Sequence, residues 1–301
     1  MTALRAEEPQ QPVLSVVPDP SPLPFSLLMS VYAGDCPEFL RRAFTSSVQQ
    51  QVRRPDEVVL VQDGPVSVEL ACCIDALCAE SPVPVQRVRL EQNQGLARAL
   101  DAGLAACRYE VVARMDADDI SLPDRFAHQL PEIESGADLV GSALLEIGAD
   151  EHEVVGRRTP PTTTAVIEQT ARLHDPFNHP TVVYRRSAVE AAGGYQHLPQ
   201  MEDYWLFARM IASGARTTNR PEPLVLYRVG AGAYERRGGR ALLRAELALQ
   251  VLFLRSGFTT WREFARNVAL RGLYRLVPAG VRRPAYRLIV ATRGERLDRG
   301  R

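Results

Sequence analysis

Short apolar runs alternate with amphipathic segments through the first third of this chain, and this alternation limits the fold more than any other feature. The apolar runs occupy residues 25–32, 57–64, 85–90 and 110–116, and helical spacing of apolar side chains fills residues 38–50, 68–78 and 95–106. Short continuous apolar runs are typical of parallel strands buried on both faces. Strand and helix in turn at this length predict a parallel, right-handed, doubly wound sheet.

Three of the four runs end on or beside a polar side chain, namely Tyr32, Asp63 and Asp116. Ligands of open α/β sheets bind beyond the carboxyl ends of the strands. We therefore expect these three side chains at one ligand-binding edge.

The alternation weakens after Asp119. We expect strands at 139–147 and 181–184 and helices at 162–173 and 202–213. A Leu/Ala/Arg-rich helical region follows Gly239, with breaks at Gly257, Pro278 and Pro284.

Composition excludes several classes of protein. The 301 residues are 46% apolar and 24% charged, which is ordinary for a globular protein and argues against a fibrous or wholly disordered chain. The net charge of zero does not suggest a nucleic-acid partner. The five cysteines include no paired C-x-x-C spacing, so idle thiols in a reducing compartment are favoured over a metal or disulfide role.

Apolar segments that would target or span a membrane are not evident. The N-terminal residues contain no apolar core of a signal peptide, and no stretch approaches the roughly 18 apolar residues of a spanning helix. We therefore expect a cytoplasmic protein whose contact with a membrane is peripheral.

Three carboxylates within four positions follow the fourth apolar run, in Arg114-Met115-Asp116-Ala117-Asp118-Asp119. Carboxylates packed this closely repel one another unless a cation or hydrogen-bond donors lie between them. Mg²⁺ or Mn²⁺ would fit, because such an ion takes one or two carboxylates and completes its shell with water and substrate phosphates. Taken alone, the motif is equally explained by an acidic surface loop or the start of a helix.

The acidic motif is one of several motifs in this chain that occur in the order found in one family. On these motifs the chain resembles the family-2 inverting glycosyltransferases of the A-type nucleotide-sugar fold, in particular the branch that builds bacterial capsule, O-antigen and amylovoran repeat units. The motifs are Ser30-Val31-Tyr32, Gln62-Asp63-Gly64, Asn93-Gln94-Gly95-Leu96-Ala97, Ala113-Arg114-Met115-Asp116-Ala117-Asp118-Asp119, Asn178-His179-Pro180-Thr181-Val182, Gly193-Gly194-Tyr195 and Glu202-Asp203-Tyr204-Trp205-Leu206. The resemblance covers roughly residues 25–240. It implies a Rossmann-like, mostly parallel sheet flanked by helices, with a helical, basic C-terminal extension.

The resemblance also implies which residues bind the nucleotide sugar. They are Ser30, Tyr32, Asp63, Asn93, Gly95, Arg98, Arg114, Asp116, Ala117 and Asp118. Asp63 would accept a hydrogen bond from uracil or ribose, Asp116 would bind ribose or the donor sugar, and Asp118 would bind the metal. The alternative for Asp63 is a turn former in Asp-Gly.

By the same resemblance, Asp203 is the general base that deprotonates the acceptor hydroxyl in a single inverting displacement, with Glu202 beside it. Two carboxylates here could also merely favour the start of a helix. Acceptor or diphosphate contacts are assigned to Asp119, His179, Trp205, Arg236 and Arg237. A lone histidine is as often structural, and the arginine pair could be a solvated charge run.

The chain divides into a Pro-rich leader at 1–24, expected to be disordered, a catalytic domain at 25–240 and a C-terminal segment at 241–301. The catalytic domain has a nucleotide-binding half at 25–119 and an acceptor-binding half at 120–240. Every basic side chain is arginine, and arginines crowd the sequence after Tyr234. The helices of this arginine-rich C-terminal segment could lie on the inner leaflet of the membrane, where anionic lipid attracts each arginine by about 1 kcal/mol. The alternative is a helical subdomain packed on the core with its arginines in water.

These observations predict an inverting glycosyltransferase that moves a hexose or N-acetylhexosamine from a nucleotide sugar, UDP being implied by the resemblance, to a saccharide or polyprenol-linked acceptor with Mn²⁺ or Mg²⁺. One rival is a catalytically silent nucleotide-sugar-binding protein, which the full set of Asp63, Asp116, Asp118 and Asp203 disfavours. The other is a nucleotidyltransferase, which would require a Gly-rich, basic loop near the first strand. Residues 30–36 do not have that composition.

Overall fold

The computed structural model describes residues 23–229 and 240–276. Nearly all of the expected leader, Arg236, Arg237 and the breaks at Pro278 and Pro284 lie outside these residues. In the part described, no helix is long and apolar enough to cross a bilayer.

The first half of the molecule is the predicted parallel sheet. Its elements are β1 (Phe25–Tyr32), α1 (Pro37–Val48), β2 (Glu57–Asp63), α2 (Val68–Glu80), β3 (Val85–Leu90), α3 (Leu96–Ala106) and β4 (Val111–Met115). The strands pair in the order β3-β2-β1-β4, and every one of these pairs is parallel. The alternation in the sequence therefore predicted this half correctly.

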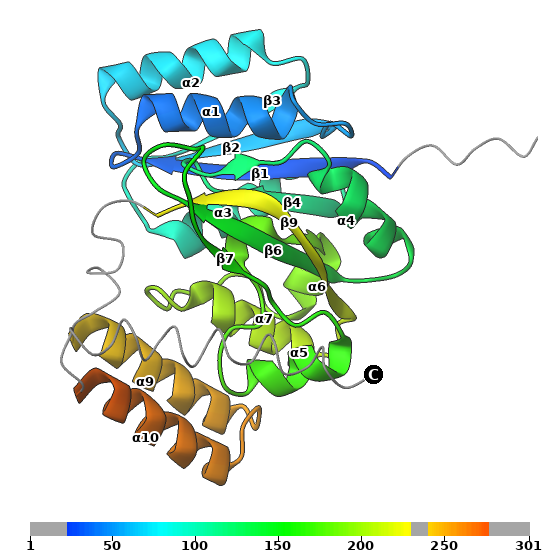
Figure 1. The fold of residues 1–301 in the computed structure, drawn as a ribbon. Helices are drawn as coiled ribbons and strands as arrows, with labels where there is room; N and C mark the ends of the chain where they lie inside the picture. Colours follow the sequence, from blue (N-terminus) through cyan, green and yellow to red (C-terminus); the bar gives the residue numbers. More distant parts are fainter. Residues whose placement is uncertain (1–22, 230–239, 277–301) are drawn as a thin grey trace, which may run out of the picture.

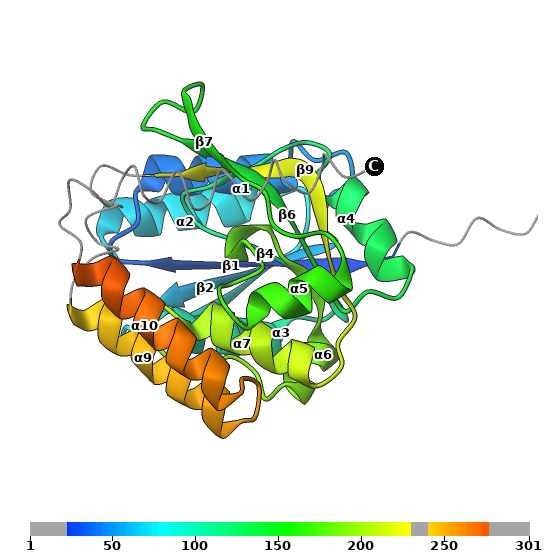
Figure 2. The same ribbon diagram turned by 60° about the horizontal axis from the view of Figure 1, so that its bottom comes forward.

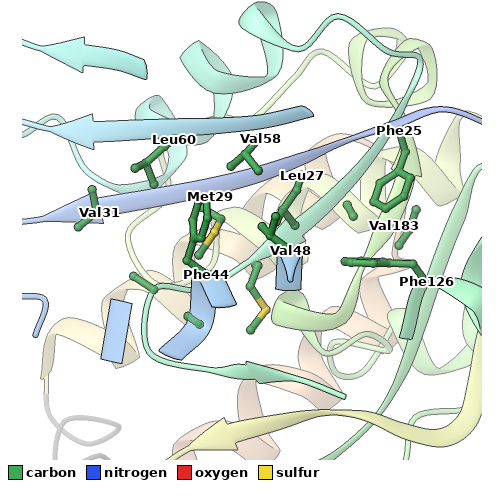
Figure 3. Close-up of a cluster of buried hydrophobic side chains, with 14 of the residues drawn as sticks. Phe25, Leu27, Met29, Val31, Phe44, Val48, Val58, Leu60, Phe126 and Val183 are labelled. Carbon is green, nitrogen blue, oxygen red and sulfur yellow. The ribbon is translucent and has the colours of Figure 1, made fainter. Parts of the chain in front are cut away.

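Side chains of β1 alternate between two apolar layers, as the pleat of a strand requires. Phe25, Leu27 and Met29 join the cluster formed with α1, α2 and a later helix, α4 (Arg125–Glu134) (Figure 3), whereas Leu28 joins the cluster formed with α3. Helices cover both faces of the sheet (Figure 2). Burial on both faces is the reason that these strands read as continuous apolar runs.

The second half extends the same sheet with mixed pairing. Its elements are β5 (Ile120–Ser121), α4 (Arg125–Glu134), β6 (Leu139–Ile147), β7 (Val154–Arg158), α5 (Thr164–Ala171), η1 (His179–Thr181), β8 (Val183–Arg185), α6 (Arg186–Ala191), α7 (Glu202–Ala212) and β9 (Thr217–Arg228). The order continues from β4 through β8, β6 and β9 to β5, and β7 pairs with β6. The strand expected from Thr181 begins instead at Val183, because residues 179–181 form a 3₁₀ turn.

Two elements of this half contain proline and were not predicted from the sequence. The 12-residue strand β9 contains Pro221 and Pro223, and its pairing with β6 shifts register between Ser142 and Leu144. Proline removes a ladder donor and is tolerated at such irregularities. Helix α4 likewise contains Pro131.

Two C-terminal helices pack on this core (Figure 1). They are α9 (Arg240–Arg255) and α10 (Trp261–Leu276), with Gly257 in a left-handed conformation between them, at the predicted break. Thr260 and Glu263 form a reciprocal capping box at the start of α10. Phe253 is fully buried against Tyr204 and Trp205 of α7. The hairpin is thus a helical unit docked on the core.

Candidate active site at the end of β4

Asp116, Asp118 and Asp119 lie just beyond the carboxyl end of β4, the strand that runs between β1 and β8. One carboxylate oxygen from each of the three lies within 4.8 Å of the others. The chain brings them together because they follow one buried strand directly. Asp119 is fully buried, whereas Asp118 is exposed.

Three arginines, each at most 8% exposed, surround these carboxylates. Arg114 on β4 holds Asp116 with both terminal nitrogens. Arg125 on α4 donates to the Arg114 carbonyl at 2.6 Å, and burial lowers its pKa to about 9, so it is cationic at neutral pH. The sequence argument allowed a cation or hydrogen-bond donors to offset the repulsion among the carboxylates. Burial and the charge of Asp116 raise the pKa of Asp118 and outweigh Arg114 and Arg228, which lower it.

Arg228, the last residue of β9, is the third of these arginines. Its backbone N–H donates to Asp119 Oδ1 at 2.8 Å, and its guanidinium donates to the Asp118 carbonyl at 3.1 Å. The guanidinium also lies 4.1 Å from the centre of the Phe39 ring of α1. Arg228 therefore ties the end of β9 to the acidic cluster. Nothing in the sequence around Arg228 signals this role, which depends on the sheet order.

The carboxylates retain capacity for a cation. Oxygen Oδ2 of Asp119 is buried and has no hydrogen-bond partner, which is rare for a charged group unless an ion or water completes it. Desolvation, then the charge of Asp116, raises the pKa of Asp118 to about 6. Hard oxygen donors of this kind suit Mg²⁺ or Mn²⁺. The residues therefore fit the divalent ion that the motif predicted.

Asp35, in the turn after β1, is a fourth carboxylate near this cluster, and sequence reasoning did not single it out. It accepts a hydrogen bond from the backbone N–H of Tyr32 at 2.9 Å. Burial raises its pKa to about 6, with further contributions from Asp118 and Asp116.

Asp63 at the end of β2 organises the loop before α3. Its two carboxylate oxygens accept hydrogen bonds from the backbone N–H groups of Gln94, at 2.7 Å, and Gly95, at 3.0 Å. Gly64 has a φ of +85°, and a Cβ there would lie 2.5 Å from the Asn93 nitrogen. The glycine of Gln-Asp-Gly thus allows the loop to approach the strand end closely, and Asp63 holds it there.

The remaining residues assigned to the nucleotide sugar are distributed around these two strand ends. Tyr32 is 49% exposed at the end of β1, and Ser30 lies two residues before it on the same strand. Asn93 and Arg98 are exposed, Gly95 caps the start of α3, and Ala117 is buried within the acidic motif. Figure 1 shows the ends of β1, β2 and β4 at one edge of the sheet.

Asp203, in the first turn of α7, lies beside a buried aromatic and histidine network. Oxygen Oδ2 of Asp203 is 3.7 Å from Nδ1 of His179, and Nε2 of His179 is 3.1 Å from the Tyr195 hydroxyl. Burial, then the charge of Arg114, lowers the pKa of His179 well below its usual value, so the ring is neutral. Gly194 has a φ of +66° and turns the chain so that Tyr195 enters this network. The histidine assigned to acceptor or diphosphate contact therefore lies beside Asp203.

A second carboxylate near Asp203, Asp175, was missed by the sequence analysis. Burial, then the charge of Asp203, raises the pKa of Asp175 well above its usual range. Burial also raises the pKa of Asp203, and the backbone N–H of Tyr204 and then the charge of Arg114 oppose that effect. The charge of Asp203 thus disfavours ionisation of its neighbour Asp175. Desolvation raises the pKa of Glu202 to about 7.

The acidic cluster and Asp203 belong to one electrostatic unit, because Arg114 and Asp116 both act on the pKa of Asp203. Trp205 does not join this unit. Its indole is 7% exposed, donates to Gln196 at 2.9 Å and packs on Phe253. The charges of Arg114 and Asp116 thus link a candidate base to a candidate cation site, which suits group transfer from a phosphate-linked donor.

Comparison with known sequences agrees with this chemistry. The sequence model of glycosyl transferase family 2 matches residues 26–193. An "Uncharacterized glycosyltransferase" of Haemophilus influenzae is 39% identical over 87% of this chain and 97% of its own length. The amylovoran biosynthesis glycosyltransferase AmsE of Erwinia amylovora is 39% identical over 85% of this chain and 96% of its own length. The "UDP-Gal:alpha-D-GlcNAc-diphosphoundecaprenol beta-1,3-galactosyltransferase" of Escherichia coli is 30% identical, with 88% and 96% covered.

Among solved structures, S. aureus TarS 1–349 in complex with UDP-GlcNAc superimposes with a TM-score of 0.59 at 16% identity, covering 77% of this chain and 67% of that one. At this identity the likeness concerns the fold alone. It confirms the predicted mixed α/β architecture of the A type.

The raised pKa of Asp118 predicts how Mn²⁺ binding depends on pH. Above about pH 6 the carboxylate is ionised and free for the metal, and below it a proton competes for the same oxygens. The association constant for Mn²⁺, measured by calorimetry, should fall about tenfold for each proton displaced per pH unit below 6. The Asp118→Asn variant should bind Mn²⁺ weakly at every pH. An affinity that is constant between pH 5 and 7.5 in the wild type would contradict this assignment.

Proposed function

The chain belongs to glycosyl transferase family 2, and from that premise we propose that it moves a hexose or N-acetylhexosamine from a UDP sugar to a hydroxyl of a lipid-linked saccharide. This transfer would be a step in cell-envelope polysaccharide or glycolipid synthesis at the cytoplasmic face of a membrane. The observation that carries the proposal is the pairing of a cation-competent acidic cluster with Asp203 in one electrostatic unit. The names of the Erwinia and Escherichia relatives support the pathway and the donor.

In this proposal the donor side is built from the strand ends. Tyr32 offers an exposed ring for stacking on the base, and the Asn93 to Gly95 loop, held by Asp63, flanks it. Asp116, fixed by Arg114, presents its remaining lone pairs to ribose or sugar hydroxyls. Asp118 would hold Mn²⁺ or Mg²⁺ with Asp119 as support, and such an ion supplies positive charge that stabilises the departing diphosphate.

On the acceptor side Asp203 takes the proton of the attacking hydroxyl. The acceptor oxygen then forms a bond to the anomeric carbon as the bond from that carbon to the diphosphate oxygen breaks, and UDP leaves. One displacement inverts the anomeric configuration. General base catalysis of this kind contributes about 10²–10⁴-fold. Burial beside neutral His179 keeps the pKa of Asp203 above that of a solvated aspartate, which makes it a better proton acceptor once ionised.

Binding and turnover test the two sides separately. UDP, GDP and dTDP sugars are titrated by calorimetry with and without Mn²⁺ into wild type and Asp118→Ala. We expect metal-dependent binding of the UDP class, lost in the variant. Transfer is then measured with GlcNAc-diphosphoundecaprenol as the acceptor probe. Asp203→Asn should bind the donor normally but lose at least about 100-fold in rate, whereas Glu202→Gln should lose less. Normal turnover by Asp203→Asn would remove that residue from the role of base.

We also propose that α10 lies against anionic lipid. Trp261 is 66% exposed at the start of this helix, and Arg262 and Arg266 follow it. An exposed tryptophan beside arginines is typical of an interfacial helix. Arg262→Glu changes the charge by two, so at about 1 kcal/mol per charge its partition onto vesicles with anionic lipid should fall roughly 10- to 30-fold. Arg54→Glu, on the strand-forming half, is the control. Equal losses in both variants, or none, would end this proposal.

A further inference from the structure

The C-terminal hairpin docks on the two segments that carry the acceptor side of the site. One is α7, whose first turn holds Asp203, and the other is the chain that leaves α5 toward His179. Figures 1 and 2 both place α9 beside α7. The apolar cluster at this contact contains these buried residues: Ala171, Leu198, Tyr204, Trp205, Ala208, Leu249, Phe253 and Phe258. Its members come from the acceptor half and the hairpin, and none comes from β1 to β4.

Three successive backbone carbonyls at the end of α5 receive side-chain donors from outside that helix. The Tyr204 hydroxyl of α7 donates to the Ala171 carbonyl at 2.7 Å. On α10, Asn267 Nδ2 donates to the Arg172 carbonyl at 2.7 Å, and Arg271 Nη2 donates to the Leu173 carbonyl at 2.8 Å. The last carbonyls of a helix have no partner within it. Here α7 and α10 supply those partners, so the exit of the chain from α5 is fixed by the hairpin.

Asn267 is itself fully buried and held in place. It donates to Gln250 of α9 at 2.9 Å, and Gln250 is also fully buried. Arg172 returns the contact by donating to the Phe258 carbonyl, between the two hairpin helices, at 2.8 Å. A buried polar network of this kind tolerates few alternative arrangements, because each broken hydrogen bond leaves a desolvated polar group.

The segment fixed in this way leads directly to the groups around Asp203. Asp175 lies two residues beyond Leu173, and the charge of Asp203 acts on its carboxyl group. His179 follows, 3.7 Å from the same carboxylate. Burial raises the pKa of Tyr204, and the side chains of Arg271 and Asp175 act on it with opposite sign, so both side chains lie near its hydroxyl. The hairpin therefore contacts the start of segment 172–179, and the end of that segment lies beside Asp203.

From these contacts we infer that the α9–α10 hairpin is part of the acceptor side of the active site, and that Asn267 and Arg271 are positioning residues that hold segment 172–179 against Asp203. The inference rests on the proposed function, in which Asp203 is the base. It gives the hairpin a role in the reaction that is separate from any contact with lipid.

Arg271 offers the sharpest test, because it is only partly buried and a conservative variant exists. Arg271→Met removes the donor to Leu173, Arg271→Lys keeps a donor on a long stem, and Asn267→Leu is the second disruptive variant. Arg255→Met, an exposed change on α9, is the matched control. Hydrogen exchange of the full-length protein is followed at residues 173–179 and 203–206. UDP affinity with Mn²⁺ and the rate of UDP release on transfer of the donor sugar to GlcNAc-diphosphoundecaprenol are measured on the same samples.

We expect Arg271→Met and Asn267→Leu to speed exchange in both segments at least tenfold and to slow UDP release at least tenfold, with the Kd for UDP within twofold of wild type. Arg271→Lys should keep at least half the rate, and Arg255→Met should match wild type. Unchanged exchange and release in both disruptive variants would overturn the inference. So would a loss of UDP affinity parallel to the loss of rate, because that would show general loosening. Failure of the proposed function would appear instead in the wild type, as no UDP binding and no release, while the exchange comparison still decides the hairpin contact.

Discussion

The ion pair of buried Arg114 with half-buried Asp116 is the interaction on which the site depends. A guanidinium that is 2% exposed inside a sheet is tolerated only when its charge is matched. Asp116 supplies the charge, and Arg125 donates to the Arg114 carbonyl. Arg228 donates to the Asp118 carbonyl and, through its backbone N–H, to the Asp119 carboxylate. Each of these arginines comes from a different strand or helix. Positioning the cluster therefore requires β4, α4 and β9 to be in place together.

The same arginine connects the two halves of the molecule. Arg114 opposes the rise in the pKa of Asp203 that burial causes, and it lowers the pKa of His179. Desolvation is the largest cause of both shifts, and the charge of Arg114 on β4 adds to it for His179 and opposes it for Asp203. The parallel half contributes the strand ends proposed to bind the donor, while the mixed half contributes Asp203, the proposed base, and the segment proposed to hold it. The hairpin packs on α7 and on the end of α5, which belong to the mixed half.

Sequence reasoning succeeded where the information was local. The β-α alternation repeats over residues 25–116, so β1 to β4 could be predicted, and the three carboxylates are neighbours in the chain. It failed where tertiary pairing decides the structure. Pro221 and Pro223 disguised β9, whose last residue is Arg228, and no pattern linked Arg125 or Asp35 to the acidic motif. Trp205 was assigned to acceptor or diphosphate contact, but in the structure it is buried in the contact between α7 and the hairpin.

The central claim is that Asp203 and the acidic cluster perform one inverting displacement. The most direct measurement is the anomeric configuration of the product, read by proton NMR after transfer from an α-linked UDP sugar. A β-linked product is predicted, because the acceptor oxygen attacks from the face opposite the diphosphate. An α-linked product would contradict the account, since retention of configuration cannot arise from a single displacement with Asp203 as base.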